Sequence, residues 1–298
     1  MVKCKIRQTD FMHKFFKKPS VPLLICAGLL CAAVFLAAGC AAKQGAIAFG
    51  AKDRETEETK PAGIPLPILM YHTVCPGRHE RYVIPPSVLE EDLIYIKSNG
   101  YTAVTIADLI GFKEKGIPLP EKPIMLTFDD GNRTNYLHAF PLLQKHGLKA
   151  VFSVVGAYCD EPQKHSSVTY GQIKEMTESG LVEIQNHSYG AHKIGKRNGL
   201  RKKRGETAEE YEAFLTADLL KFEQRLEKET GLRTSAVTFP FGAFSAEAIA
   251  FLPKLGFKAA LICTEGVNYI TKDTNLFLLK RYNRPYGKSA ERILSRAR

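Results

Sequence analysis

The chain has 298 residues, of which 45% are hydrophobic and 24% are charged. This composition is ordinary for a globular protein and excludes wholesale disorder, and the length allows one large α/β domain or two ordinary ones. The net charge is +11, but it falls to +6 once residues 1–39 are left out. A positive net charge on the rest of the chain favours binding to an anionic surface or to a nucleic acid. The basic residues at 196–204 have no aromatic residue among them, which favours a solvated loop.

The N-terminal segment has the layout of an export signal: a basic stretch, an uncharged apolar run over 21–39, and small residues around Cys40. Residues 36–40, LAAGC, resemble a bacterial lipoprotein cleavage box, in which the Cys is lipidated and becomes the new N-terminus. An uncleaved membrane anchor is the alternative, because the run is just long enough to span a bilayer. We therefore predict a signal over 1–40, a flexible tether over 41–63 and a folded domain over 64–298. The protein is expected to be exported and attached to the outer face of a bacterial cell membrane.

Within the predicted domain, short apolar runs alternate with longer amphipathic stretches. The predicted strands cover 66–71, 124–128, 150–155, 181–185, 236–239, 258–262 and 276–280. The predicted helices lie near 88–98, 134–146, 169–179, 206–230, 245–255 and 288–297. This alternation is typical of parallel strands with helices packed outside them. The fold class predicted is therefore α/β, a distorted (β/α) barrel with about seven parallel strands in a single domain.

Polar residues follow several of these strands, at the end where barrels carry their reactive groups. They are His72, Asp129 and Asp130, His187 and His192, the turn at 240–242, and Arg281. Because the carboxyl ends of parallel strands meet at one rim, we expect all of them to converge there.

Two of these groups indicate a metal site. Asp129 and Asp130 come directly between an apolar strand and Gly131, an arrangement that is equally compatible with an ordinary acidic turn. His187 and His192 follow another strand end and lie on one loop. One carboxylate and two neutral imidazoles form a plausible open site for a divalent ion.

The stretches 127–131, TFDDG, and 186–192, NHSYGAH, resemble the first two motifs of the NodB-type polysaccharide deacetylases. This carbohydrate esterase family removes N-acetyl groups from chitin, peptidoglycan and exopolysaccharide, and the resemblance spans roughly residues 64–285. It implies that Asp129 is the general base and that Asp130, His187 and His192 bind a divalent metal. Zinc is the expected metal, and cobalt or nickel could support the same chemistry.

Three departures from the family pattern refine this resemblance. The two His residues of the second motif are five apart instead of four, as in a branch that includes poly-N-acetylglucosamine deacetylases. The third motif, usually Arg-x-Pro-Tyr, is here 238–242, TFPFG, so its Arg is absent and Arg281 is the candidate replacement. No His follows His192. The permuted strand order of that branch implies that His72 is the general acid. The resemblance also implies that the backbone N–H of Phe241 donates a hydrogen bond to the oxyanion.

The function predicted is metal-dependent hydrolysis of N-acetyl groups from an N-acetylglucosamine-containing cell-wall or extracellular polysaccharide. One alternative is an inactive deacetylase-like domain that binds glycan without cutting it. Another is a metal hydrolase of a different bond, such as an O-acetyl ester. An exported protein is not expected to have a nucleic-acid partner, and the sequence does not indicate an oligomeric state.

Overall fold

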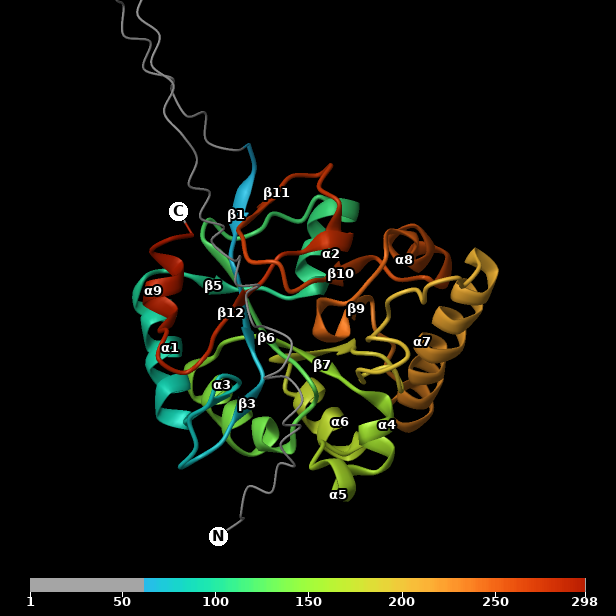
Figure 1. Cartoon of the computed structure of the whole chain (residues 1–298). Helices are drawn as coiled ribbons and strands as arrows, with labels where there is room; N and C mark the ends of the chain where they lie inside the picture. The colour runs from blue at the N-terminus through green and yellow to red at the C-terminus, as the bar shows by residue number, and fades with distance from the viewer. Residues whose placement is uncertain (1–61, 298) are drawn as a thin grey trace, which may run out of the picture. The chain divides into compact units, whose positions relative to one another are not determined.

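The computed structural model describes residues 62–297, so the predicted signal over 1–40 and almost all of the predicted tether over 41–63 lie outside the described residues. The central element is a parallel sheet in the order β10-β9-β8-β7-β6-β2-β12, curled into a half-barrel (Figure 1). Its strands are β2 (Ile68–Tyr71), β6 (Pro123–Phe128), β7 (Ala150–Val154), β8 (Val182–Asn186), β9 (Ala236–Thr238), β10 (Ala259–Leu261) and β12 (Tyr282–Asn283). These seven parallel strands among the described residues confirm the predicted fold class.

Shorter strands lie around this sheet. β5 (Thr102–Ala103) pairs with β6 in parallel. β1 (Ile64–Leu66) pairs antiparallel with β11 (Asn268–Ile270), and β3 (Thr73–Val74) pairs with β4 (Val83–Ile84).

The predicted strand over 276–280 is wrong. Residues Leu276–Leu278 form a 3-10 helix, η5, which begins after Asn275, whose side chain accepts a hydrogen bond from Phe277 N. The last parallel strand is β12, farther along the chain. Leu279 hydrogen-bonds to β10 through Ala260 O (3.0 Å), and Arg284 N donates to Met70 O of β2 (3.0 Å). The segment 279–284 therefore joins the two ends of the curled sheet, with Arg281 between them.

All six predicted helical stretches contain helix. They are α1 (Pro86–Ser98), η2 (Asn135–Ala139) with α3 (Phe140–His146), α6 (Tyr170–Glu178), α7 (Ala208–Thr230), α8 (Ala246–Phe251) with η4 (Leu252–Leu255), and α9 (Ala290–Leu294). Three helices were not predicted from the sequence: α2 (Ile106–Lys115), α4 (Gly156–Asp160) and α5 (Pro162–His165).

The sequence of helix α7 explains where the helix begins and ends. Thr207 and Glu210 form a capping box at its start, and Gly231 ends it in the left-handed conformation at φ 77°. Its apolar residues Leu215, Leu219, Phe222 and Leu226 recur every three or four positions and are fully buried. Phe222 and Leu226 pack with β7 and β8, whereas Leu215 and Leu219 pack with β9 and β10. The helix thereby covers one side of the sheet end that carries His187.

Strand β6 is buried along its whole length, as is typical of a parallel strand with both faces covered. It runs through the middle of the sheet and ends directly before Asp129. Among residues 62–297, no helix is long and apolar enough to cross a membrane.

Candidate active site

The predicted site residues come together where the central strands end. His72 follows β2, Asp129 and Asp130 follow β6, and His187 follows β8. The prediction that Arg281 follows a strand is wrong: it directly precedes β12, and its side chain reaches Asp129. Phe241 lies in η3 (Pro240–Gly242), the turn after β9. Asp129 N donates a hydrogen bond to the carbonyl oxygen of Tyr71, next to His72 (3.0 Å), and His187 Nε2 lies 3.5 Å from Asp130 Oδ1. Their convergence on one rim is thus observed, while the catalytic role of each stays a prediction.

Asp130, His187 and His192 form a cluster that can hold a metal ion. Their ligand atoms all lie within 4.8 Å of one another. Asp130 Oδ1 is 3.1 Å from His192 Nε2 and 3.5 Å from His187 Nε2. The two imidazoles, from one loop, thus face the same carboxylate oxygen.

The chemistry of the donor set fits a divalent ion. His187 Nδ1 lies 2.7 Å from Thr238 O, which can only accept, so Nδ1 carries a proton and Nε2, which faces Asp130, is the nitrogen left to bind a metal. Three protein ligands of this kind are typical of catalytic sites that keep a position open. Burial alone would raise the pKa of Asp130, but His192 and His187 outweigh it and hold that pKa well below its ordinary value. The carboxylate is therefore ionised, as a ligand must be.

A tight turn separates the two neighbouring carboxylates. Asp130 and Gly131 both have positive φ, at 72° and 70°. A Cβ on Gly131 would lie 2.8 Å from Val154 Cγ1, so a side chain at this position would collide with β7. Asp130 contacts the two imidazoles, whereas Asp129 contacts Arg281.

Asp129 and Arg281 form a buried bidentate ion pair. Arg281 Nη1 lies 2.7 Å from Asp129 Oδ1, and Nη2 lies 2.9 Å from Oδ2. Arg281 is 0% exposed and Asp129 is 2% exposed. The guanidinium also donates from Nε to Ile262 O and from Nη1 to Thr127 Oγ1. Burial alone would raise the pKa of Asp129, but Arg281 and His187 together hold it below its ordinary value.

His72 and Phe241 lie near this centre. The His72 ring is half-buried and 4.6 Å from the Tyr82 ring. Burial lowers the pKa of His72, and the Asp130 and Asp129 carboxylates oppose that shift. The Phe241 ring lies 4.6 Å from the His192 ring. Phe241 has φ 59°, which is uncommon for a residue with a bulky side chain and marks a constrained turn.

Residues 116–260 match the family model described as polysaccharide deacetylase. The chain contains a polysaccharide deacetylase domain. It is 30% identical over 197 residues to the poly-beta-1,6-N-acetyl-D-glucosamine N-deacetylase of Escherichia coli (strain K12), covering 57% of this chain and 29% of that protein. It is 24% identical over 204 residues to the enzyme of the same name from Staphylococcus aureus (strain MSSA476), covering 68% of each. The chain thus spans less than a third of the Escherichia coli relative.

A solved structure has a similar fold. IcaB from Ammonifex degensii aligns with a TM-score of 0.67 and 26% identity, over 79% of this chain and 97% of that chain. The deacetylase domain therefore shares its arrangement of strands and helices with a structure of nearly the same extent.

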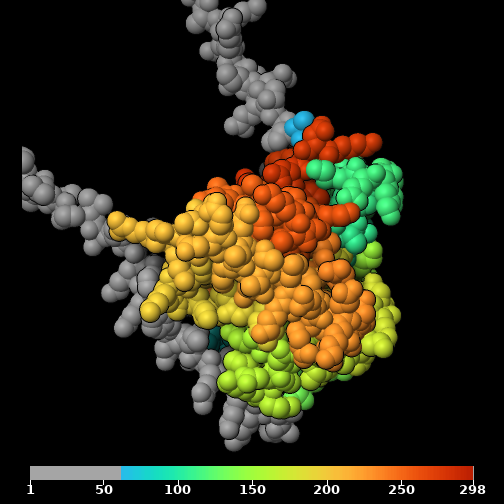
Figure 2. All heavy atoms as spheres, turned by 90° about the vertical axis from the view of Figure 1, so that its right-hand side faces the viewer, coloured from blue at the N-terminus to red at the C-terminus, as the bar shows by residue number. Residues whose placement is uncertain are grey.

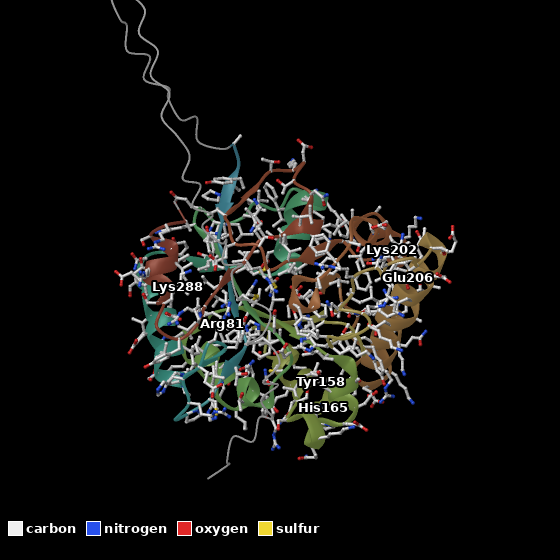
Figure 3. All side chains as sticks on the ribbon, viewed as in Figure 1. Arg81, Tyr158, His165, Lys202, Glu206 and Lys288 are labelled. Carbon is white, nitrogen blue, oxygen red and sulfur yellow. The ribbon has the colours of Figure 1, made fainter. Side chains whose placement is uncertain are left out.

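Two residues that support the site of the deacetylase domain were not predicted. Tyr158 of α4 approaches the Nδ1 and carbonyl oxygen of His192 through its hydroxyl, at 3.4 and 3.3 Å, and its ring stacks on His165 at 4.3 Å (Figure 3). Asp218 of α7 accepts hydrogen bonds from Tyr189 N and Gly190 N, both at 2.9 Å, and so holds the loop between the two imidazoles. Neither residue belongs to a motif, and each contacts the loop from a separate helix.

Replacing Arg281 tests how strongly the ion pair stabilises the domain. Arg281→Met is expected to lower the free energy of unfolding by about 3–5 kcal/mol at neutral pH, because Asp129 would remain buried without its partner. The pKa of Asp129 is lowered in the folded state. The stabilisation is therefore complete above its unfolded pKa of about 3.9 and is lost as the pH falls through its folded pKa. Urea unfolding of both proteins at neutral and acidic pH measures this effect.

Arg225→Met is the matched control for Arg281→Met. Arg225 also pairs with an aspartate, Asp160, but its side chain is 33% exposed. Its loss is expected to cost no more than about 1 kcal/mol. Equal small losses in the two variants would contradict the importance of the buried pair.

Proposed function

We propose that this chain is a metal-dependent enzyme that hydrolyses N-acetyl groups of an N-acetylglucosamine-containing cell-wall or extracellular polysaccharide. One observation carries the proposal: an ionised carboxylate, Asp129, is held by Arg281 directly beside a three-residue metal-binding cluster. A domain that only bound glycan would need no base next to a metal site. The names of the Escherichia coli and Staphylococcus aureus relatives support the substrate class.

Asp130, His187 and His192 would hold the ion, and zinc is the metal that we propose. When bound, a divalent ion supplies Lewis-acid chemistry at this position. Asp129 would accept a proton from the water that attacks the acetamide carbonyl carbon. Arg281 keeps that carboxylate ionised and orients it through two hydrogen bonds. An amide resists uncatalysed hydrolysis, so this activation of water is the first requirement of the reaction.

The remaining steps fall to His72 and Phe241. The backbone N–H of Phe241 would donate a hydrogen bond to the oxyanion that forms on the carbonyl oxygen. His72 in its protonated form would donate to the departing sugar nitrogen, because an amine leaves far more readily than an amide anion. The nearby carboxylates Asp130 and Asp129 favour the protonated imidazole and offset part of the effect of burial.

We further propose that the enzyme is exported and held at the outer face of a bacterial cell membrane. The support is the sequence of residues 21–40, an apolar run that ends at Cys40. A polysaccharide substrate outside the cell is consistent with this export signal.

Acetate release tests the proposed function. The purified protein is expected to release acetate from a short N-acetylglucosamine oligomer, to lose this activity with a chelator, and to regain it with zinc, cobalt or nickel. Absence of acetate under all these conditions would favour an inactive glycan-binding domain. Faster release from O-acetylated glycan than from the N-acetylated oligomer would instead indicate an esterase.

A further inference from the structure

The loop over 193–204, called the basic loop below, carries seven basic side chains and no acidic one. Arg197 pairs with Glu206, and Lys202 pairs with Glu247 at 3.1 Å (Figure 3 labels Lys202 and Glu206). Within residues 62–297, the other five basic side chains form no ion pair with a carboxylate. They are Lys193, Lys196, Arg201, Lys203 and Arg204. The loop therefore carries an excess of positive charge over the carboxylates near it, Asp218 and Glu206.

The backbone of the basic loop is held in place by the rest of the domain. Leu200 is fully buried, and its carbonyl accepts a hydrogen bond from the Tyr211 hydroxyl. Lys202 N donates to Ser245 Oγ at 3.1 Å. These contacts with α7 and with the residue before α8 give the positive charges a defined location.

The basic loop borders the metal-binding cluster. It begins directly after His192, and Gly199 packs on the turn that carries Phe241, where a Cβ on Gly199 would lie 2.7 Å from Pro240 O. A cavity of about 410 Å³ lies between the loop and α7, lined by Lys193, Lys196, Arg197 and Lys203 and by one carboxylate, Asp218. Figure 2 faces this side of the molecule, where the yellow loop lies next to the orange surface of α7. A glycan chain that leaves the site on this side passes over positive charge.

The proposed reaction changes the charge of its polymer. Water cleaves the C–N bond of the acetamide, the acetyl group leaves as acetate, and the sugar nitrogen becomes an amine that is protonated at neutral pH. Each turnover thus replaces a neutral group with an ammonium group. An ammonium group near the basic loop is repelled, whereas an intact N-acetyl group is not.

We propose that the basic loop makes the enzyme discriminate against glycan whose sugars next to the target have already lost their acetyl groups. This inference rests on the proposed function and deepens it. The enzyme removes acetyl groups at scattered positions, because a processed stretch becomes a poorer substrate. Surface charges are screened beyond about 8 Å at physiological ionic strength, so the discrimination is strongest at low salt.

The experiment compares two substrates of equal length, an N-acetylglucosamine pentamer and the same pentamer with one sugar replaced by glucosamine. The kcat/KM for acetate release is measured for both at low and high ionic strength. The wild-type enzyme is expected to prefer the neutral pentamer by about threefold to tenfold at low salt, and by less at high salt.

Two double variants distinguish an effect of the basic loop from an effect of the net charge of the protein. Lys196→Gln with Lys203→Gln removes two charges that line the cavity. Lys115→Gln with Lys228→Gln removes two exposed charges from the last turns of α2 and α7. These helices lead into β6 and β9, so their last turns lie at the end of the sheet opposite to the site. The first variant is expected to lose at least half of the preference, and the second is expected to retain all of it.

The outcomes are distinguishable. The role of the basic loop would be overturned if both double variants showed the same preference. It would also be overturned if the wild-type enzyme released acetate from both pentamers without any preference. Either result would leave the proposed function intact. If the wild-type enzyme with added metal released no acetate from either pentamer, the proposed function itself would fail, and this inference with it.

Discussion

Asp129→Asn is expected to lower kcat for acetate release by about 10³-fold while metal binding is retained. The amide of asparagine cannot accept a proton from the attacking water, but the cluster of Asp130, His187 and His192 is unchanged. Acetate release at saturating substrate gives kcat, and the metal content of the purified variant shows whether the cluster still binds. Undiminished turnover in the Asp129→Asn protein would exclude Asp129 as the base.

Two further variants make the Asp129 result interpretable. His187→Ala is expected to lose both metal and activity, because it removes one of the three ligands. Asp108→Asn is the aspartate control outside the site, since Asp108 lies in the first turn of α2 and pairs with Lys149, and it is expected to keep both. Thermal unfolding of all three proteins shows how much of any loss comes from a smaller folded fraction.

His72→Ala is expected to lower the rate by about 10²- to 10⁴-fold and to abolish the fall in activity at high pH. Only the protonated imidazole can donate to the leaving amine, so the wild-type rate declines as the pH rises through the pKa of His72. Burial lowers that pKa, so the decline begins at a lower pH than for an exposed imidazole. Profiles of kcat/KM against pH for both proteins measure the effect.

His138→Ala is the control for the His72 variant. His138 lies on η2, and burial lowers its pKa as well. This variant is expected to keep both the rate and the high-pH decline. A His72→Ala enzyme with the same rate and the same decline as the wild-type enzyme would show that the acid lies elsewhere.

The structure confirms those elements whose signals are local. Strand β6 could be predicted because its apolar residues are followed directly by an acidic turn with glycine, and α7 because a capping box and a terminal glycine enclose its apolar stripe. The helices α4 and α5 were missed because they have five and four residues. Helices this short are stabilised by tertiary contacts more than by their own sequence.

The run at 276–280 shows where local patterns fail. Five residues rich in leucine have the composition of a buried strand, but a run this short does not distinguish a strand from a helical turn. The Asn275 side chain caps a 3-10 turn, and Leu279 then hydrogen-bonds to β10. Both sheet ends must be in place before the segment can join them, so its structure depends on partners far away in the chain.

The sequence by itself determined the chemical character of the site: a strand-end pair of carboxylates and two imidazoles on one loop, in stretches that resemble the deacetylase motifs. Only the tertiary structure decided how these groups are paired. Arg281 meets Asp129 across 152 residues, and the Thr238 carbonyl, 51 residues from His187, sets the tautomer of that imidazole. The physical reason is that local sequence encodes turns, caps and periodicity, whereas a buried ion pair forms only where the curled sheet brings together two segments that are far apart in the chain.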